Sequence, residues 1–371
     1  MFELSKRDSD IIKGIAIILM YVHHFFCFPT WYVDGISYPQ LTGFAEFFRF
    51  PTKICVPVFA FLTGYVYNKN NEGGGKKIIY SVRKITDFYI GYWCVFIPLF
   101  ILAVALKSET FSFCNFLMQL FGVNSNTMLF AWYVPFFVFS MIVLPIINKC
   151  GNYNYIIFIG TTFVAIKFFS QIIIWSTDVS WVKNVMCDFQ ATFPLVIIGY
   201  CFSNWRIFCK FQSAIKINKK IVLILIMSLI IILTFLSKRH HISFKFGEMY
   251  FKDGIIDISY SIDIISVPLF IWAIVNIIHM IGFNRLILKI FEEIGKKSMM
   301  MWFVSCAFFS NLSQKLQPFL YWPHNPVLVV LWGCLLCYII SIFFNILSKN
   351  LCKFKNKLFK QILNRYMDTT I

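Results

Sequence analysis

Charged residues are scarce in this sequence of 371 residues. Asp, Glu, Lys and Arg make up 14% of the chain, whereas hydrophobic residues make up 59% and aromatic residues 19%. A water-soluble domain cannot bury that much apolar surface in one core, so the composition excludes a soluble globular fold. Lipid satisfies no backbone hydrogen bonds, and the apolar runs are continuous rather than alternating. We therefore expect membrane-spanning helices and not a barrel.

Acidic residues are few compared with basic ones. The chain has 17 Asp and Glu against 34 Lys and Arg, which gives a formal net charge of +17. In a soluble protein this excess would suggest a nucleic-acid partner. Here the basic residues lie in short loops and tails between apolar runs, and no basic stripe with base-stacking aromatics lies outside those runs. We therefore expect contacts with the anionic head groups of a lipid bilayer and no nucleic-acid partner.

The sequence also lacks the spacing of a metal site or a disulfide framework. Its 12 cysteines are scattered and lie mostly inside apolar runs, where they are expected to be small buried hydrophobes. Cys334 and Cys337 form a CxxC pattern within such a run, and packing is favoured over a redox or metal role. His240 and His241 have no further ligand types near them in the sequence, so no metal site is predicted.

No internal repeat and no long polar linker divides the chain, which indicates one membrane domain. Runs of roughly 17 to 25 mostly apolar residues are long enough to cross a bilayer as helices. The fold class predicted is therefore an all-α integral membrane bundle of about ten transmembrane helices. The predicted spans are Ile11–Phe28, Phe44–Tyr67, Phe88–Leu106, Leu129–Ile147, Tyr155–Ile174, Met186–Phe202, Ile221–Leu236, Ile256–Ile278, Ser298–Leu312 and Pro326–Leu347.

The distribution of Lys and Arg among the loops predicts the orientation. Most of them fall in the two tails and in the loops on the same side, so both termini are expected in the cytoplasm. The loop Ser237–Gly254 is then expected outside a multi-pass protein of the cell membrane. We divide the chain into a transmembrane domain over residues 1–348 and a basic cytoplasmic tail over 349–371. Apolar residues interspersed in the tail predict a surface helix on the inner leaflet.

The first apolar run carries titratable groups that a membrane helix normally avoids. A Lys buried in a span costs roughly 2.5–3.5 kcal/mol, so Lys13 calls for a partner, a cavity or a function. His24 follows Lys13 by eleven residues, which places the two within about 20° of one helix face and about 16 Å apart. Asp10 can pair with Lys13 at i, i+3. A neutral imidazole is suited to take a proton from a hydroxyl, although a packed histidine is the alternative for His24.

The stretch KGIAIILMYVHHFF resembles the first helix of the acyltransferase 3 family of membrane acyltransferases. That helix has a basic residue, ten intervening residues and a histidine, and Lys13 and His24 fit the spacing. Lys13 stands where the family usually has Arg. One ammonium binds phosphate less exactingly than a bidentate guanidinium, so donor binding is expected to be slightly weaker here.

Four further segments are similar to the family in the expected order. KICVPVFAFLTGYVY has Thr63 where Ser is usual and retains Gly64. KKIIYSVRKITDFY resembles a basic stretch of the family, although Arg83 and Lys84 are adjacent rather than separated. AWYVPFFVFSMIVLP resembles the stretch that precedes a family helix. IGKKSMMMWFVSCAFF resembles a block near the C-terminal end, with Ser305 standing where members commonly have His.

The resemblance implies transfer of an acyl group, commonly acetyl, from cytoplasmic acyl-coenzyme A to a hydroxyl of a cell-envelope carbohydrate. Acyl-coenzyme A is then a co-substrate, and no metal is implied. His24 would deprotonate the acceptor or carry the acyl group transiently, and both mechanisms stay open. The coenzyme phosphates need cations, for which Lys13, Arg83 and Lys84 are the candidates.

Four residues are candidates for binding the acceptor. They are Lys53, Thr63, Trp132 and Asp263. Lys53 has the alternative of snorkelling to the interface, and Trp132 that of a packing or belt aromatic. Asp263 is costly in lipid and is therefore expected to face a cavity or a partner.

A transporter or a flippase of lipid-linked glycans is the competing interpretation, because buried Lys, His and Asp also mark transport paths. Neither an inverted repeat nor paired broken helices support it. A non-catalytic scaffold does not explain a buried His that shares a helix face with Lys13. The sequence leaves the acceptor and the oligomeric state open.

Overall fold

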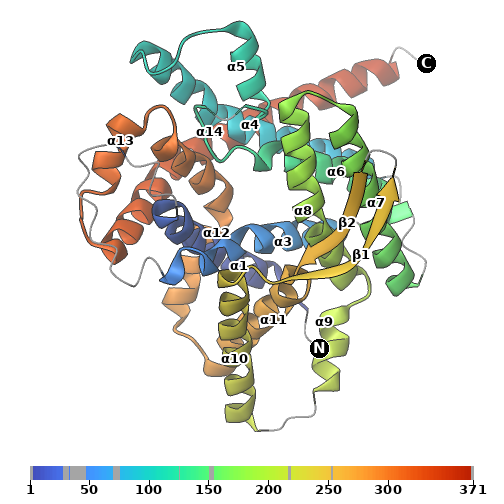
Figure 1. Ribbon diagram of the computed structural model, residues 1–371. Coiled ribbons are helices and arrows are strands. Elements are labelled where there is room, and N and C mark those ends of the chain that lie inside the picture. Colours follow the sequence, from blue (N-terminus) through green and yellow to red (C-terminus); the bar gives the residue numbers. More distant parts are fainter. Residues whose placement is uncertain are drawn as a thin grey trace.

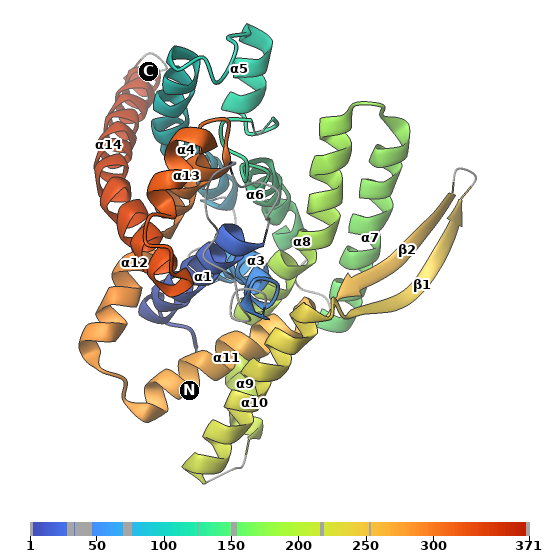
Figure 2. The same ribbon diagram turned by 60° about the vertical axis from the view of Figure 1, so that its left-hand side comes forward.

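The structure is a computed structural model that describes residues 3–27, 33, 47–69, 76–124, 126–149, 154–215, 219–251 and 254–368. Most of these residues are helical, as the sequence predicts. The described elements are α1 Lys6–Phe26, η2 Pro51–Ile54, α3 Cys55–Lys69, α4 Lys76–Ala105, α5 Phe113–Leu120, α6 Tyr133–Lys149, α7 Tyr155–Ser176, α8 Ser180–Asn204, α9 Ile207–Ala214, α10 Lys220–Arg239, β1 Ser243–Phe251, β2 Gly254–Ser261, α11 Asp263–Ile281, α12 Arg285–Cys306, η3 Ala307–Phe309, α13 Ser313–Leu320 and α14 Pro326–Asp368. Helices α1 and α3 lie in the middle of the molecule with the other helices around them (Figures 1 and 2).

Seven helices among the described residues are long and apolar enough to cross a membrane: α1, α4, α7, α8, α10, α11 and α14. They correspond to seven of the ten predicted spans. The other three predictions fall on α3 and α6, which have 15 and 17 residues, and on α12, whose first half is rich in charge. The structure thus supports a multi-pass helical membrane protein, while the count of ten is not confirmed.

The predicted span from Ile256 to Ile278 is wrong at its start. Strand β2 runs from Gly254 to Ser261, and α11 begins only at Asp263. The segment IDISYS alternates apolar and polar residues, which is the period of a strand rather than of a helix. It pairs with β1 in antiparallel register, and this hairpin projects sideways from the helices (Figure 2).

Two other predicted boundaries move. The first three residues of the span predicted from Phe44 lie outside the described residues, and within the described part the 3-10 turn η2 precedes the α-helix, which starts at Cys55. The short span predicted at Ser298 is the second half of α12, which starts at Arg285 behind an Asn284 side chain that accepts from Leu286 N. Helix α14 continues through residue 348 without a break, so the domain division at that point stays a prediction.

Helices α3 and α8 touch backbone to backbone through two glycines. A Cβ on Gly64 would lie 1.8 Å from the carbonyl oxygen of Val196, and one on Gly199 would lie 1.9 Å from that of Phe61. Neither position tolerates a side chain without separating the helices. Small residues at such crossings let membrane helices gain van der Waals contact that larger residues prevent.

Helices α1 and α12 also contact each other backbone to backbone through two glycines. A Cβ on Gly14 would lie 2.1 Å from the carbonyl oxygen of Phe291, and one on Gly295 would lie 1.7 Å from that of Asp10. The two contacts are reciprocal, as in the α3–α8 pair. They fix the height and rotation of α1, the helix that carries both Lys13 and His24.

Charged side chains reinforce the α1–α12 contact outside the membrane-spanning segments. Arg7 Nε donates to Glu292 Oε2 at 3.2 Å, and Lys296 Nζ lies 2.7 Å from Glu292 Oε1 and 2.8 Å from Glu293 Oε1. Hydrogen bonds from Lys296 lower the pKa of both carboxyls, and the carboxylates raise the pKa of Lys296. Glu292, Glu293 and Lys296 therefore stay charged around neutral pH. Because these pairs are largely exposed to solvent, we expect each to contribute little to stability.

The first turn of α1 is closed by a capping box. The Ser5 hydroxyl accepts from Asp8 N, and the Asp8 carboxylate accepts from Ser5 N, both at 3.0 Å. The same carboxylate contacts His279 Nε2 of α11 at 3.0 Å. Leu4 N donates to the hydroxyl of Tyr65 in α3 at 3.2 Å. The beginning of α1 is thus tied to two other helices.

We expect Gly199→Ala to destabilise the fold, because its new methyl group would meet the Phe61 carbonyl. Overpacking of this kind costs about 1–3 kcal/mol. The measurement is the thermal unfolding midpoint of the purified chain in detergent. Gly160→Ala is the matched control, since a Cβ there meets no atom within 4 Å, and a helical Gly→Ala change is neutral or stabilising. Equal midpoints for the two variants would contradict the close-contact account.

Candidate functional site

His24 is buried near the C-terminal end of α1 with its ring against Phe130. The two ring centroids are 3.7 Å apart and the planes differ by 14°, so the rings are stacked. His24 is 6% exposed, and its Nδ1 makes no hydrogen bond to the residues that the structure describes. A buried polar atom without a partner costs about 1–3 kcal/mol, and such atoms often mark functional sites. Stacking therefore holds the imidazole plane while Nδ1 stays available to a ligand.

His23 is buried beside it and makes a different contact. Its Nδ1 lies 2.7 Å from the carbonyl oxygen of Arg49. A carbonyl oxygen only accepts, so His23 carries a proton on Nδ1. The centroids of the two imidazoles are 5.6 Å apart. His23 has a backbone contact that positions it, whereas His24 is positioned by packing.

The segment that supplies Phe130 also contains Trp132 and contacts Thr63, two of the predicted acceptor-binding residues. Trp132 and Tyr133 follow Phe130 in the chain, with their ring centroids 5.7 Å apart. The Tyr133 hydroxyl faces the side chain of Thr63 in α3. Thr63 Oγ1 donates to the Phe59 carbonyl at 2.9 Å, so its lone pairs remain for another donor. Thr63 is thereby linked to the short segment that contains Phe130, the ring on which His24 stacks, together with Trp132.

Asp263 pairs with a residue that the sequence did not single out. Lys238 Nζ, in the last turn of α10, donates to Asp263 Oδ2 at the start of α11. The Asp263 side chain is 5% exposed, and its other oxygen, Oδ1, has no partner within the described residues. The predicted partner for this costly carboxylate is thus confirmed as Lys238. Electrostatic interactions link Lys238 and the exposed Lys53 to His23, which places the pair at the histidine end of α1.

Lys13 lies in the first half of α1, toward its N-terminal end. Its Nζ is 3.1 Å from Asp10 Oδ1, which confirms the predicted i, i+3 pair. Lys84 of α4 interacts electrostatically with Lys13 and with Lys6. Two of the three predicted donor-binding cations, Lys13 and Lys84, are therefore brought together from separate helices. Their positive charge has one neighbouring carboxylate, Asp10, within ion-pair distance in the described part of the chain.

Arg83 is the third predicted cation and is the least confined. Its side chain is 64% exposed, and its Nε lies 3.9 Å from Asp87 Oδ2. Asp87 also accepts from Lys355 Nζ of α14 at 2.5 Å. Arg83 is thus near Lys84 in the helix but is directed toward Asp87.

Ser305 occupies the position where the family commonly has His, and it is fully buried in α12. Its hydroxyl donates to the carbonyl oxygen of Trp302 at 2.7 Å. The Ser305 hydroxyl proton is therefore used in a hydrogen bond within α12. Ser305 therefore offers no replacement for an imidazole base.

The sequence could not have shown several of these neighbours. Phe130 precedes the quoted AWYVPFF stretch, but stacking between two aromatic rings leaves no spacing signature. Lys238 and Asp263 are separated by the β1–β2 hairpin, so their pairing depends on where α11 begins. The sequence did indicate that Asp263 needs a partner, because a carboxylate in an apolar run is costly. It could not indicate that this partner is Lys238.

The site thus has two poles on one helix. Cations gather near Lys13, and an available imidazole lies near the opposite end at His24, about 16 Å along the axis. The first pole can hold an anionic donor, and the second can accept a proton or a group.

The comparisons with known proteins identify the family. A family model described as an acyltransferase domain matches residues 7–346 of the 371. The match runs from the first turn of α1 into α14 and so contains both poles. No curated protein and no solved structure matches the chain. A match over nearly the whole sequence, together with the helical membrane architecture, shows that the chain belongs to the acyltransferase 3 family of membrane acyltransferases.

Proposed function

We propose that the protein transfers an acyl group, with acetyl as the simplest case, from acyl-coenzyme A to a hydroxyl of a cell-envelope carbohydrate. The single observation that carries this proposal is the His24 imidazole, which is stacked on Phe130 and has a buried Nδ1 without a described partner. An imidazole fixed in plane, with one nitrogen available, suits proton transfer or group transfer.

The donor is proposed to bind at the Lys13 end of α1. Coenzyme A carries phosphates, which ammonium and guanidinium groups bind by charge-assisted hydrogen bonds. Lys13 and Lys84 lie close enough to interact electrostatically, and Arg83 adds charge next to them. The excess of Lys and Arg on this side supports a cytoplasmic location for both termini in the cell membrane. The thioester would then reach along α1 toward His24.

Direct transfer balances as follows. The acceptor hydroxyl gives its proton to His24, and its oxygen attacks the thioester carbonyl carbon. The carbon–sulfur bond breaks, and the coenzyme leaves as a thiol after it takes the proton back from the imidazolium. In the covalent alternative, a His24 nitrogen attacks the thioester carbonyl carbon, the carbon–sulfur bond breaks and the coenzyme leaves as a thiolate; the acceptor oxygen then displaces the imidazole from the acyl group, and the hydroxyl proton passes to the thiolate. Both routes need the same imidazole and the same two substrates.

The acceptor is proposed to approach from the opposite end of α1. Thr63 can accept a hydrogen bond there, and Trp132 can stack on a sugar ring. Lys53 is exposed near His23, and Asp263 acts through its ion pair with Lys238. These four residues would orient the acceptor, while His24 would carry out the chemistry.

We expect His24→Ala to lower the transfer rate by about 10²–10⁴-fold, the usual contribution of a general base. The measurement is release of free thiol from acetyl-coenzyme A by the chain in proteoliposomes that contain cell-envelope glycans. His240→Ala, an exposed histidine, is the control and should keep the wild-type rate. Full activity of His24→Ala would remove His24 from the mechanism.

We expect Lys13→Ala to raise the KM for acetyl-coenzyme A by about ten-fold, as expected for one lost charge-assisted contact. The value of kcat should change less, because this contact exists before and during the reaction. Lys13→Arg should preserve or improve the KM, since a guanidinium can bind phosphate with two hydrogen bonds. Lys315→Ala, an exposed cation on α13, is the control. An unchanged KM in Lys13→Ala would place the donor phosphates elsewhere.

A further inference from the structure

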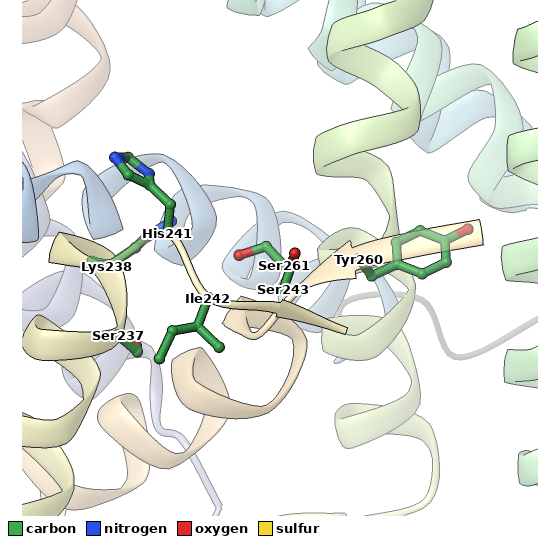
Figure 3. A pocket seen from close by; sticks show the side chains of 7 residues that line it. All are labelled: Ser237, Lys238, His241, Ile242, Ser243, Tyr260 and Ser261. Carbon is green, nitrogen blue, oxygen red and sulfur yellow. The ribbon is translucent and has the colours of Figure 1, made fainter. Parts of the chain in front are cut away.

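A small polar cavity lies where α10 meets the β1–β2 hairpin. Its volume is about 200 Å³. A water molecule in the liquid occupies about 30 Å³, so the cavity has room for one compact group such as a phosphate ester or a single sugar ring. The side chains around it are shown in Figure 3. They are Ser237, Lys238, His241, Ile242, Ser243, Tyr260 and Ser261.

Among the residues that the structure describes, the lining of this cavity offers several hydrogen-bond donors and contains no carboxylate. It has one ammonium, one imidazole and the hydroxyls of Ser243 and Ser261, while the hydroxyls of Ser237 and Tyr260 donate to the carbonyls of Thr234 and Phe163. Figure 3 shows the hydroxyls of Ser243 and Ser261 across from Lys238 and His241. Neutral sugar hydroxyls need strong acceptors as well as donors, whereas a phosphate or a carboxylate only accepts. This lining is therefore suited to an anion.

Lys238 is held at the wall of the cavity by its ion pair. Its ammonium has three donors, of which one goes to Asp263 Oδ2. The Lys238 side chain is 14% exposed, so water competes little for the other two donors. Hydrogen bonds from a charged, desolvated donor are about twice as strong as neutral ones. Asp263 is thus a positioning residue for a cation that faces the cavity.

His241 adopts a backbone conformation that such a residue normally avoids. Its φ is 51°, in the left-handed region that residues with a Cβ seldom adopt. Its ring packs edge-on against Phe50 with the centroids 6.0 Å apart. This conformation ends α10 as a Schellman motif, in which His241 N donates to the Lys238 carbonyl at 3.3 Å and Ile242 N donates to the Ser237 carbonyl at 3.2 Å. The conformation here puts an imidazole at the cavity.

We propose that this cavity binds an anionic group, a phosphate ester or a carboxylate, on the sugar that accepts the acyl group. The proposal rests on the proposed acyl transfer. Lys238 interacts electrostatically with His23, the residue next to His24. An acceptor anchored here by its charge would hold a hydroxyl of the same molecule toward His24. The site would thereby select anionic glycans over neutral ones.

The test is direct binding to the full chain in detergent micelles, measured by titration calorimetry in a phosphate-free buffer. The probes are glucose 6-phosphate, glucuronate and glucose. We expect both charged sugars to bind, with glucose at least about ten-fold weaker, since it lacks the charge-assisted contacts. Equal affinity for glucose and glucose 6-phosphate would overturn the proposal.

Substitutions of the lining residues test whether glucose 6-phosphate binds in this cavity. His241→Gln and the double variant Ser243→Ala with Ser261→Ala should each weaken glucose 6-phosphate by about ten-fold. His240→Gln is the matched control, because this exposed neighbour does not line the cavity. Lys238→Met combined with Asp263→Leu removes both buried charges at similar volume, which avoids an unpaired carboxylate. If all of these variants bind like the wild type, the anion site is elsewhere and the proposal fails.

A lipid head group could supply the same anion, and nanodiscs separate the two sources. We expect the affinity for glucose 6-phosphate to be the same in phosphatidylcholine and in phosphatidylglycerol nanodiscs. Competition by phosphatidylglycerol would assign the cavity to lipid and overturn its role in acceptor selection. Binding is measured without acyl transfer, so failure of the cavity leaves the transfer proposal standing. Failure of transfer, with anion binding intact, would instead remove the proposed function.

Discussion

Backbone contact between helices at glycines is the constraint on which the rest of the molecule depends. In lipid, helices gain nothing by hiding apolar surface from water, so they associate through close packing and polar contacts. Gly14 and Gly295 bring α1 against α12, while Gly64 and Gly199 do the same for α3 and α8. Each contact is too close for any side chain. The position of α1 is therefore fixed by shape rather than by its charged residues.

Because α1 is held in a fixed position, its polar residues Lys13 and His24 are also held in defined positions. Its beginning is held by the capping box and by ion pairs, which leaves Lys13 beside Lys84 near that end. Near its other end, packing on Phe130 holds His24 without using Nδ1. One rigid helix thus carries a cationic pole and an available imidazole at a constant separation. This arrangement suits a donor and an acceptor that approach from opposite ends.

The sequence predicted what depends on neighbouring residues in one helix. The spacing of Lys13 and His24, and the pairing of Lys13 with Asp10, follow from helical geometry alone, and the pair is confirmed. The predicted start of α11 was wrong, because the short alternating strand β2 was interpreted as part of the longer apolar run that follows it. Partners such as Phe130 and Lys238 come from distant segments. Their contacts depend on how helices pack, and a single sequence carries no period or spacing for that.

The central claim is that this chain adds an acyl group to a cell-envelope glycan through His24. The most direct measurement is mass spectrometry of those glycans from cells that make the wild type, His24→Ala, or no copy of the protein. The account predicts that one acetyl increment is present with the wild type and lost in the other two. An unchanged acetyl pattern, with whole glycans missing from the surface, would contradict it and indicate a transporter.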